Sequence, residues 1–61
     1  MTQDQKIKQR LAAHKILMDW HHEVNGMAHG TASTHAYEQI KGQSPAKIKR
    51  IVKEWTGKTL A

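Results

Sequence analysis

Apolar residues recur at helical spacing in the first part of the chain. The i, i+3, i+4, i+7 pattern is followed by Ala13, Ile16, Leu17, Trp20 and Val24. Strong helix formers surround these positions, and either Thr2 or Asp4 can cap the start. The pair Asn25-Gly26 suits a left-handed helix end. We therefore expect a first helix over residues 4–24.

A shorter apolar pattern follows after a connection that contains glycine. Its buried side would consist of Ala36, Tyr37 and Ile40, and it stops at Lys41-Gly42. Three residues with hydroxyl oxygens can serve as its N-cap, and the pattern does not choose among Thr31, Ser33 and Thr34. We place this second helix over residues 33–41.

The third helix has the clearest boundaries. Ser44 is a good N-cap, and Pro45 occupies the first helical position, where its missing N–H costs nothing. Gly57 ends the helix. The apolar stripe consists of Ile48, Ile51, Val52 and Trp55. These signals predict a helix over residues 45–56 and a loose tail from Lys58 to Ala61. With no strand pattern, the expected fold is all-α, a single domain of three helices.

The chain has 61 residues and no cysteine. A chain this short buries only about 60% of the surface that its unfolded form exposes, so its core is small. That size argues against a self-sufficient enzyme, and the lack of cysteine excludes a zinc finger of the usual type. No apolar run reaches the roughly 20 residues of a membrane span, and the N-terminus does not resemble a signal peptide. We expect a cytoplasmic protein that does not attach to membranes.

The net charge of +5 is concentrated toward the C-terminal end. Residues 31–61 carry six of the ten Lys and Arg side chains, against only Glu38 and Glu54. Such a cluster favours a polyanionic partner, with nucleic acid first and an anionic membrane second. The plainer interpretation is a solvated helix face.

The second and third expected helices have the layout of a helix-turn-helix. A short helix meets a turn containing Gly42, and a helix with a sharp N-terminus follows. In that motif the second helix enters the major groove of double-stranded DNA. Arg or Lys can pair with guanine and Gln with adenine, while Ser and Lys can hold phosphates. The predicted DNA-binding residues are Gln43, Ser44, Ala46, Lys47, Lys49, Arg50 and Lys53, together with Thr34.

These residues give the chain a family likeness. Residues 33–55 resemble the small helix-turn-helix repressors of phages and plasmids. The resemblance rests on Gly42, on the segment Gln43-Ser44-Pro45-Ala46-Lys47-Ile48 and on Ile51. That family includes the autoregulators found beside anti-CRISPR genes. Such motifs usually have a small residue where Glu38 stands, so a shifted turn or a plain three-helix bundle stays an alternative. The resemblance implies a homodimer that binds a palindromic operator in its own promoter and represses transcription.

The first helix carries more apolar surface than one narrow stripe. Two short helices cannot cover it all, which favours a second apolar contact and hence a dimer. Two copies would match half-sites one helical turn apart. A monomer core filled by Trp and flexible Met is the alternative. The predicted interface residues are Leu11, Ile16, Leu17, Met18, Trp20 and Val24.

Histidines and hydroxyls suggest two further kinds of site. Positions i, i+4 and i+7 or i+8 of one helix face are occupied by His14, Met18, His21 and His22. Imidazoles at i, i+4 spacing can chelate zinc or copper, but no Cys pair or His-Glu-x-x-His motif accompanies these residues. Ser33 and His35 are neighbours in the sequence, but no orienting acid for a catalytic triad is evident. We expect no metal, no cofactor and no enzymatic activity.

A different class of function remains open beside DNA binding. The chain can be a small helical module that inhibits or adapts a host protein. A module of that kind needs a large exposed apolar patch, whereas a DNA-binding protein hides its apolar surface and exposes its cations. The position of the apolar surface therefore discriminates between the two.

Overall fold

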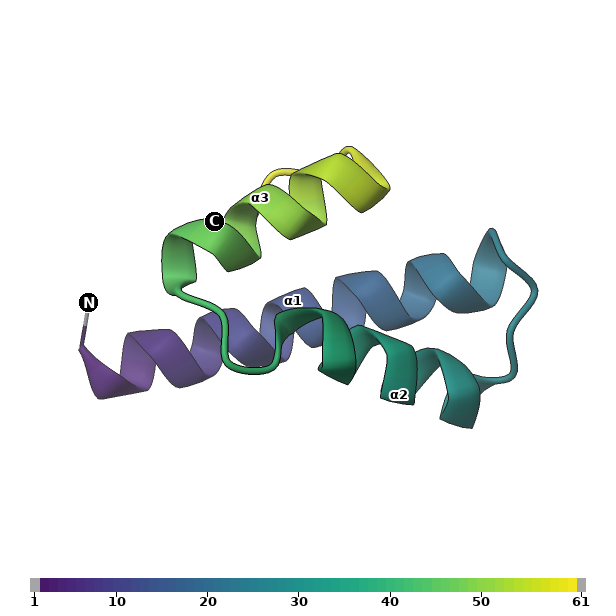
Figure 1. Cartoon of the computed structure of the whole chain (residues 1–61), viewed down its shortest axis with the longest axis horizontal. Coiled ribbons are helices and arrows are strands. Elements are labelled where there is room, and N and C mark those ends of the chain that lie inside the picture. Colours follow the sequence, from purple (N-terminus) through teal and green to yellow (C-terminus); the bar gives the residue numbers. More distant parts are fainter. Residues whose placement is uncertain (1, 61) are drawn as a thin grey trace.

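The structure is a computed structural model that describes residues 2–60. It contains three helices, α1 (Gln3–Glu23), α2 (His29–Ile40) and α3 (Pro45–Thr56), and no strand within the described residues. The predicted all-α fold of three helices is confirmed. Figure 1 shows α1 as the longest element, with α2 running back along it and α3 returning on its other side. The helices α2 and α3 both pack mainly against α1 and meet each other only slightly.

Local capping explains where α1 and α3 begin. The Thr2 hydroxyl accepts a hydrogen bond from the Gln5 backbone N–H at 3.3 Å, and the Gln5 side chain accepts one from the Thr2 N–H at 3.0 Å. Ser44 caps α3 by accepting from the Lys47 N–H at 3.3 Å, and Pro45 follows as expected. Gly57 ends α3 with a φ of 75°.

The start of α2 differs from the prediction by four residues. The helix begins at His29, and its N-cap is Ala28, which offers no side-chain hydrogen bond. All three predicted caps lie inside the helix instead. The Thr34 hydroxyl, for example, bonds back to the Gly30 carbonyl at 3.1 Å. At this helix start the His29 ring stacks on the His22 ring of α1, with centroids 3.7 Å apart.

The core is small and draws on all three helices. Its buried members are Ala13, Leu17, Ala36, Ile40, Ile48, Val52 and Leu60, with Ile16, Met18 and Ile51 packed against them. Alanines at the α1–α2 contact let these two helices approach closely, and Ala32 is also fully buried there. Two polar side chains, Gln9 and His21, are buried as well.

The structure corrects several predicted core positions. Val24, Tyr37 and Trp55 remain 64%, 56% and 46% exposed. Val24 is the C-cap residue of α1 and lies beyond its last turn, and Tyr37 lines an open groove together with Arg10 and Leu11 of α1. Trp55 meets Trp20 edge to face, with centroids 5.7 Å apart, at the edge of the core.

The expectation of a loose C-terminal tail is wrong for Leu60. This side chain is only 5% exposed and belongs to the core cluster. The Thr56 hydroxyl accepts a hydrogen bond from the Lys58 N–H at 3.1 Å, which turns the chain back after α3. Ala61, also part of that expectation, lies outside the described residues.

Candidate nucleic-acid interface

The turn before α3 is fixed from within the chain. Gly42 has a φ of 71°, which suits a residue without a Cβ. The Gln43 N–H then donates to the Ile40 carbonyl at 3.1 Å, and Ser44 closes the first turn of α3 as its cap. These local bonds set where α3 starts and in which direction it leaves the turn.

Two side chains of α1 hold the same turn from the outside. The Gln9 amide donates to the Pro45 carbonyl at 3.1 Å, and the Arg10 guanidinium donates to the Gln43 carbonyl at 3.1 Å. Gln9 is 5% exposed, so its bond is shielded from water. The sequence patterns gave no sign of either contact, because each joins residues more than 30 positions apart.

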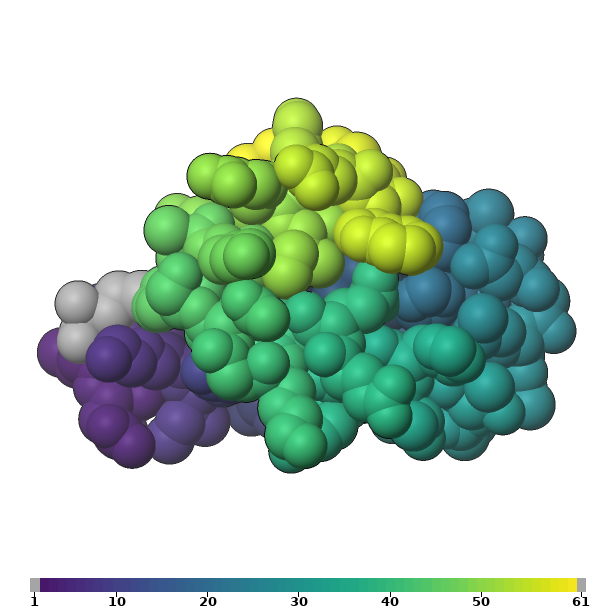
Figure 2. All heavy atoms as spheres, viewed as in Figure 1, coloured from purple at the N-terminus to yellow at the C-terminus, as the bar shows by residue number. Residues whose placement is uncertain are grey.

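The two faces of α3 have opposite characters. Ile48 and Val52 are fully buried, whereas five predicted DNA-binding residues on this helix are exposed, namely Ala46, Lys47, Lys49, Arg50 and Lys53. Helical spacing aligns Ala46, Arg50 and Lys53 in one outward ridge, opposite the buried stripe. In Figure 2 the residues of α3 stand out along one edge of the molecule.

Within residues 2–60 the cations of α3 form no ion pair, although Glu54 is also exposed on this helix. Among residues 2–60 the ion pair that the structure contains joins Lys15 to Asp19 on α1, at 3.7 Å. On α3, the Lys53 ammonium contacts only the Thr59 hydroxyl, at 3.5 Å. Their positive potential is therefore available to an anion.

The remaining predicted DNA-binding residues have different positions. Ser44 is exposed, and its oxygen accepts from the Lys47 N–H, so its hydroxyl proton is free to donate. Gln43 is half-buried beside it. Thr34 is exposed but lies in the middle of α2, separated from α3 by the second half of that helix and the turn. The structure therefore gathers seven of the eight residues and leaves Thr34 apart.

The six residues predicted for a dimer interface do not form one surface. Leu17 is fully buried within the single chain, and Ile16 and Met18 pack against the same core. Leu11 on α1 and Val24 at its C-cap are exposed, but they lie 13 residues apart, or about 20 Å along the helix axis. Trp20 is half-buried against Trp55.

The histidines take part in packing and hydrogen bonding. The His21 Nε2 lies 2.7 Å from the Gln39 side-chain oxygen, and its Nδ1 lies 3.2 Å from the Asn25 amide nitrogen. The His14 Nε2 lies 3.1 Å from both the carbonyl and the hydroxyl of Ser33. Within residues 2–60 no three His, Asp or Glu side chains gather closely enough to hold a metal ion.

Comparison with known proteins returned no relative. No protein-family model matches the chain, and no curated protein or solved structure is significantly similar to it. Across residues 2–60, none of the helices has the length and apolar character needed to cross a bilayer.

Proposed function

We propose that this protein binds double-stranded DNA through α3 and acts as a transcriptional regulator. The observation that carries the proposal is the outward basic ridge of α3 on a helix whose start is held by Ser44, Gln9 and Arg10. A helix that reads bases must be held rigidly while its outer side chains stay free. Here Ser44, Gln9 and Arg10 hold the start of the helix, while the ridge side chains are exposed.

The chemistry of the ridge suits the major groove. Arg50 can donate two hydrogen bonds to guanine O6 and N7, and Ala46 is small enough to let the helix approach the base edges. Lys49 and Lys53 flank the ridge at positions suited to phosphate oxygens. Ser44 can add a further phosphate contact through its hydroxyl proton.

In this proposal α2, the turn 41–44 and α3 form a helix-turn-helix. Because α2 and α3 contact each other only slightly, α1 determines their relative orientation. The simplest regulator of this kind is a repressor of its own promoter that binds an inverted repeat as two copies. The second copy is part of the proposal, although the residues first expected at its interface are not collected on one face.

The test is a fluorescence-anisotropy titration with the duplex immediately upstream of the protein's own gene and a scrambled duplex. We expect binding at least about a thousandfold tighter to the upstream duplex. The Arg50→Ala variant should lose about 1–3 kcal/mol and relax base preference at one position. The Lys53→Ala variant should weaken binding to all sequences and lower the salt slope by about 1.

The matched control is Lys8→Ala, which removes the same charge from an exposed position of α1. It should leave specific binding close to that of the parent. Equal, weak and strongly salt-dependent binding to both duplexes would overturn the proposal, because net charge alone produces it. Stoichiometry at saturation then measures how many copies occupy one duplex.

A further inference from the structure

A second exposed surface lies between α1 and α2 and uses none of the outward residues of α3. Leu11 and Tyr37 are 65% and 56% exposed, and Ile7 is 49% exposed one turn before Leu11 on α1. Single exposed apolar residues are common on soluble proteins. Here Leu11 and Tyr37 line the same groove between α1 and α2, and Ile7 extends the exposed apolar surface along α1, which is the pattern of a binding surface.

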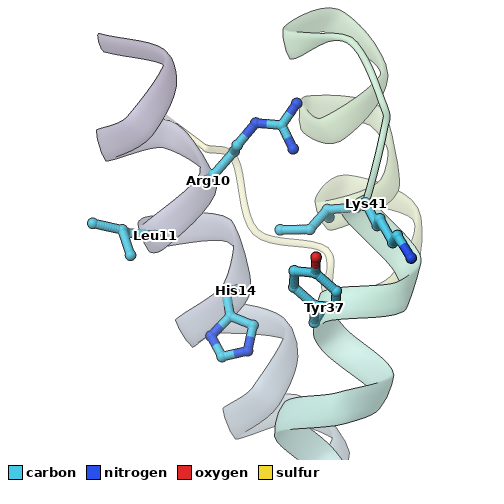
Figure 3. A pocket seen from close by; sticks show the side chains of 6 residues that line it. Arg10, Leu11, His14, Tyr37 and Lys41 are labelled. Carbon is cyan, nitrogen blue, oxygen red and sulfur yellow. The ribbon is translucent and has the colours of Figure 1, made fainter. Parts of the chain in front are cut away.

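Leu11 and Tyr37 border a groove of about 280 Å³. It is lined by Arg10, Leu11, His14, Tyr37, Ile40 and Lys41. Figure 3 shows Arg10, Leu11 and His14 coming from α1, while Tyr37 and Lys41 come from the end of α2. The lining combines the apolar or aromatic side chains of Leu11, Tyr37 and Ile40 with the polar or charged side chains of Arg10, His14 and Lys41.

Two cations, Arg10 and Lys41, are among the residues that line the groove. The Arg10 guanidinium is fixed by its bond to the Gln43 carbonyl, which uses one of its five N–H donors. The Lys41 ammonium lies 6.0 Å from the centre of the Tyr37 ring. No carboxylate is among the lining residues that the structure describes. The groove therefore combines apolar lining side chains with positive charge.

We propose that this groove docks an acidic amphipathic segment of another protein. A bulky apolar side chain of that segment fills the groove beside Tyr37 and Ile40, and its carboxylates contact Arg10 and Lys41. This binding leaves the outward residues of α3 free for the proposed contact with DNA, although Arg10 also holds the turn before that helix.

Charge and shape select this occupant. A second copy of the chain carries a net charge of +5 and would bring cations toward the cations of the groove. The apolar surface also continues past the groove to Ile7, so Ile7 to His14 spans about 10 Å of α1. That length fits about two turns of a partner helix rather than a compact small molecule.

The test uses a labelled synthetic helix with Leu and Phe on one face and Glu elsewhere, and the same peptide with Lys in place of Glu. We expect the Glu peptide to bind and the Lys peptide to bind at least about tenfold more weakly. Leu11→Ser should weaken the Glu peptide about tenfold, since it removes apolar contact area. Lys41→Glu should weaken it at least about threefold.

Lys53→Glu is the matched control, because it reverses one charge on the outward face of α3. It should spare peptide binding and impair DNA binding, whereas Lys41→Glu should impair peptide binding much more than Lys53→Glu does, so the two proposals can fail separately. Thermal unfolding verifies that each variant folds, and Lys41→Gln replaces Lys41→Glu if the latter does not.

Three results would overturn the docking proposal. Equal weakening by Lys41→Glu and Lys53→Glu would mean that the peptide senses only net charge. Self-association that Leu11→Ser abolishes, measured by sedimentation equilibrium, would make the occupant a second copy. DNA binding that Lys41→Glu impairs as strongly as Lys53→Glu, with no peptide binding, would assign this face to nucleic acid.

Discussion

Leu11 and Leu17 are the same residue type on the same helix, yet α1 buries Leu17 completely and leaves Leu11 65% exposed. Leu17→Ala should lower the free energy of unfolding by about 2–5 kcal/mol, because it opens a cavity in a core that cannot collapse. Leu11→Ala should change it by less than about 0.5 kcal/mol. Urea denaturation of both variants measures the difference. Similar losses of unfolding free energy in the two variants would contradict the different burial of Leu17 and Leu11. A loss in Leu11→Ala that grows with protein concentration would show that a second copy of the chain covers Leu11.

Periodicity predicted the apolar members of the core better than its polar ones. Leu17 belongs to the apolar pattern of α1, and Ile48 and Val52 belong to that of α3. All three side chains are fully buried. Two polar side chains are buried beside groups that are distant in the sequence. Gln9 donates a hydrogen bond to the Pro45 carbonyl, and His21 lies within hydrogen-bond distance of the Gln39 side chain. Helical spacing alone carries no information about such partners, so no sequence pattern could have identified them.

The three helix starts share one backbone geometry and differ in chemistry. Ala28 has φ −61° and ψ 151°, close to the values of Ser44 at −70° and 158°, but it has no oxygen to accept a hydrogen bond. Ala28→Ser should therefore raise the free energy of unfolding by about 0.5–2 kcal/mol by capping α2. Thermal unfolding measures the gain, with Ala12→Ser as the control at an exposed position inside α1. If both serines are equally destabilising, the cap geometry of α2 is not as described.

The same comparison explains which boundaries were predictable. The ends of α3 depend on Ser44, Pro45 and Gly57, whose effects are local and visible in the sequence. The start of α2 depends on packing against α1 and on the ring of His22, which local propensity cannot show. For the candidate site, the cationic residues of α3 could be predicted from their spacing. The hydrogen bonds by which Gln9 and Arg10 of α1 hold the start of α3 could not be predicted from the sequence.

At the scale of the whole molecule, α1 is the common support of the other two helices. Ile48 joins α3 to a core shared by all of them, so Ile48→Ala should lower the protection of slowly exchanging amides in all three helices together. We expect an equal decrease of about 2–5 kcal/mol in each helix, measured by native-state hydrogen exchange. Retained protection in α1 and α2, with a loss confined to α3, would show instead that α3 detaches on its own.

The separation of the two faces of α3 also makes the fold a candidate scaffold for directed evolution. Ile48 and Val52 anchor the helix, while Ala46, Arg50 and Lys53 take no part in the core. A library that randomises the outward positions would vary the exposed surface of α3 without opening a cavity. New binding specificities could then be selected on a 61-residue chain that contains no cysteine and needs no oxidative folding.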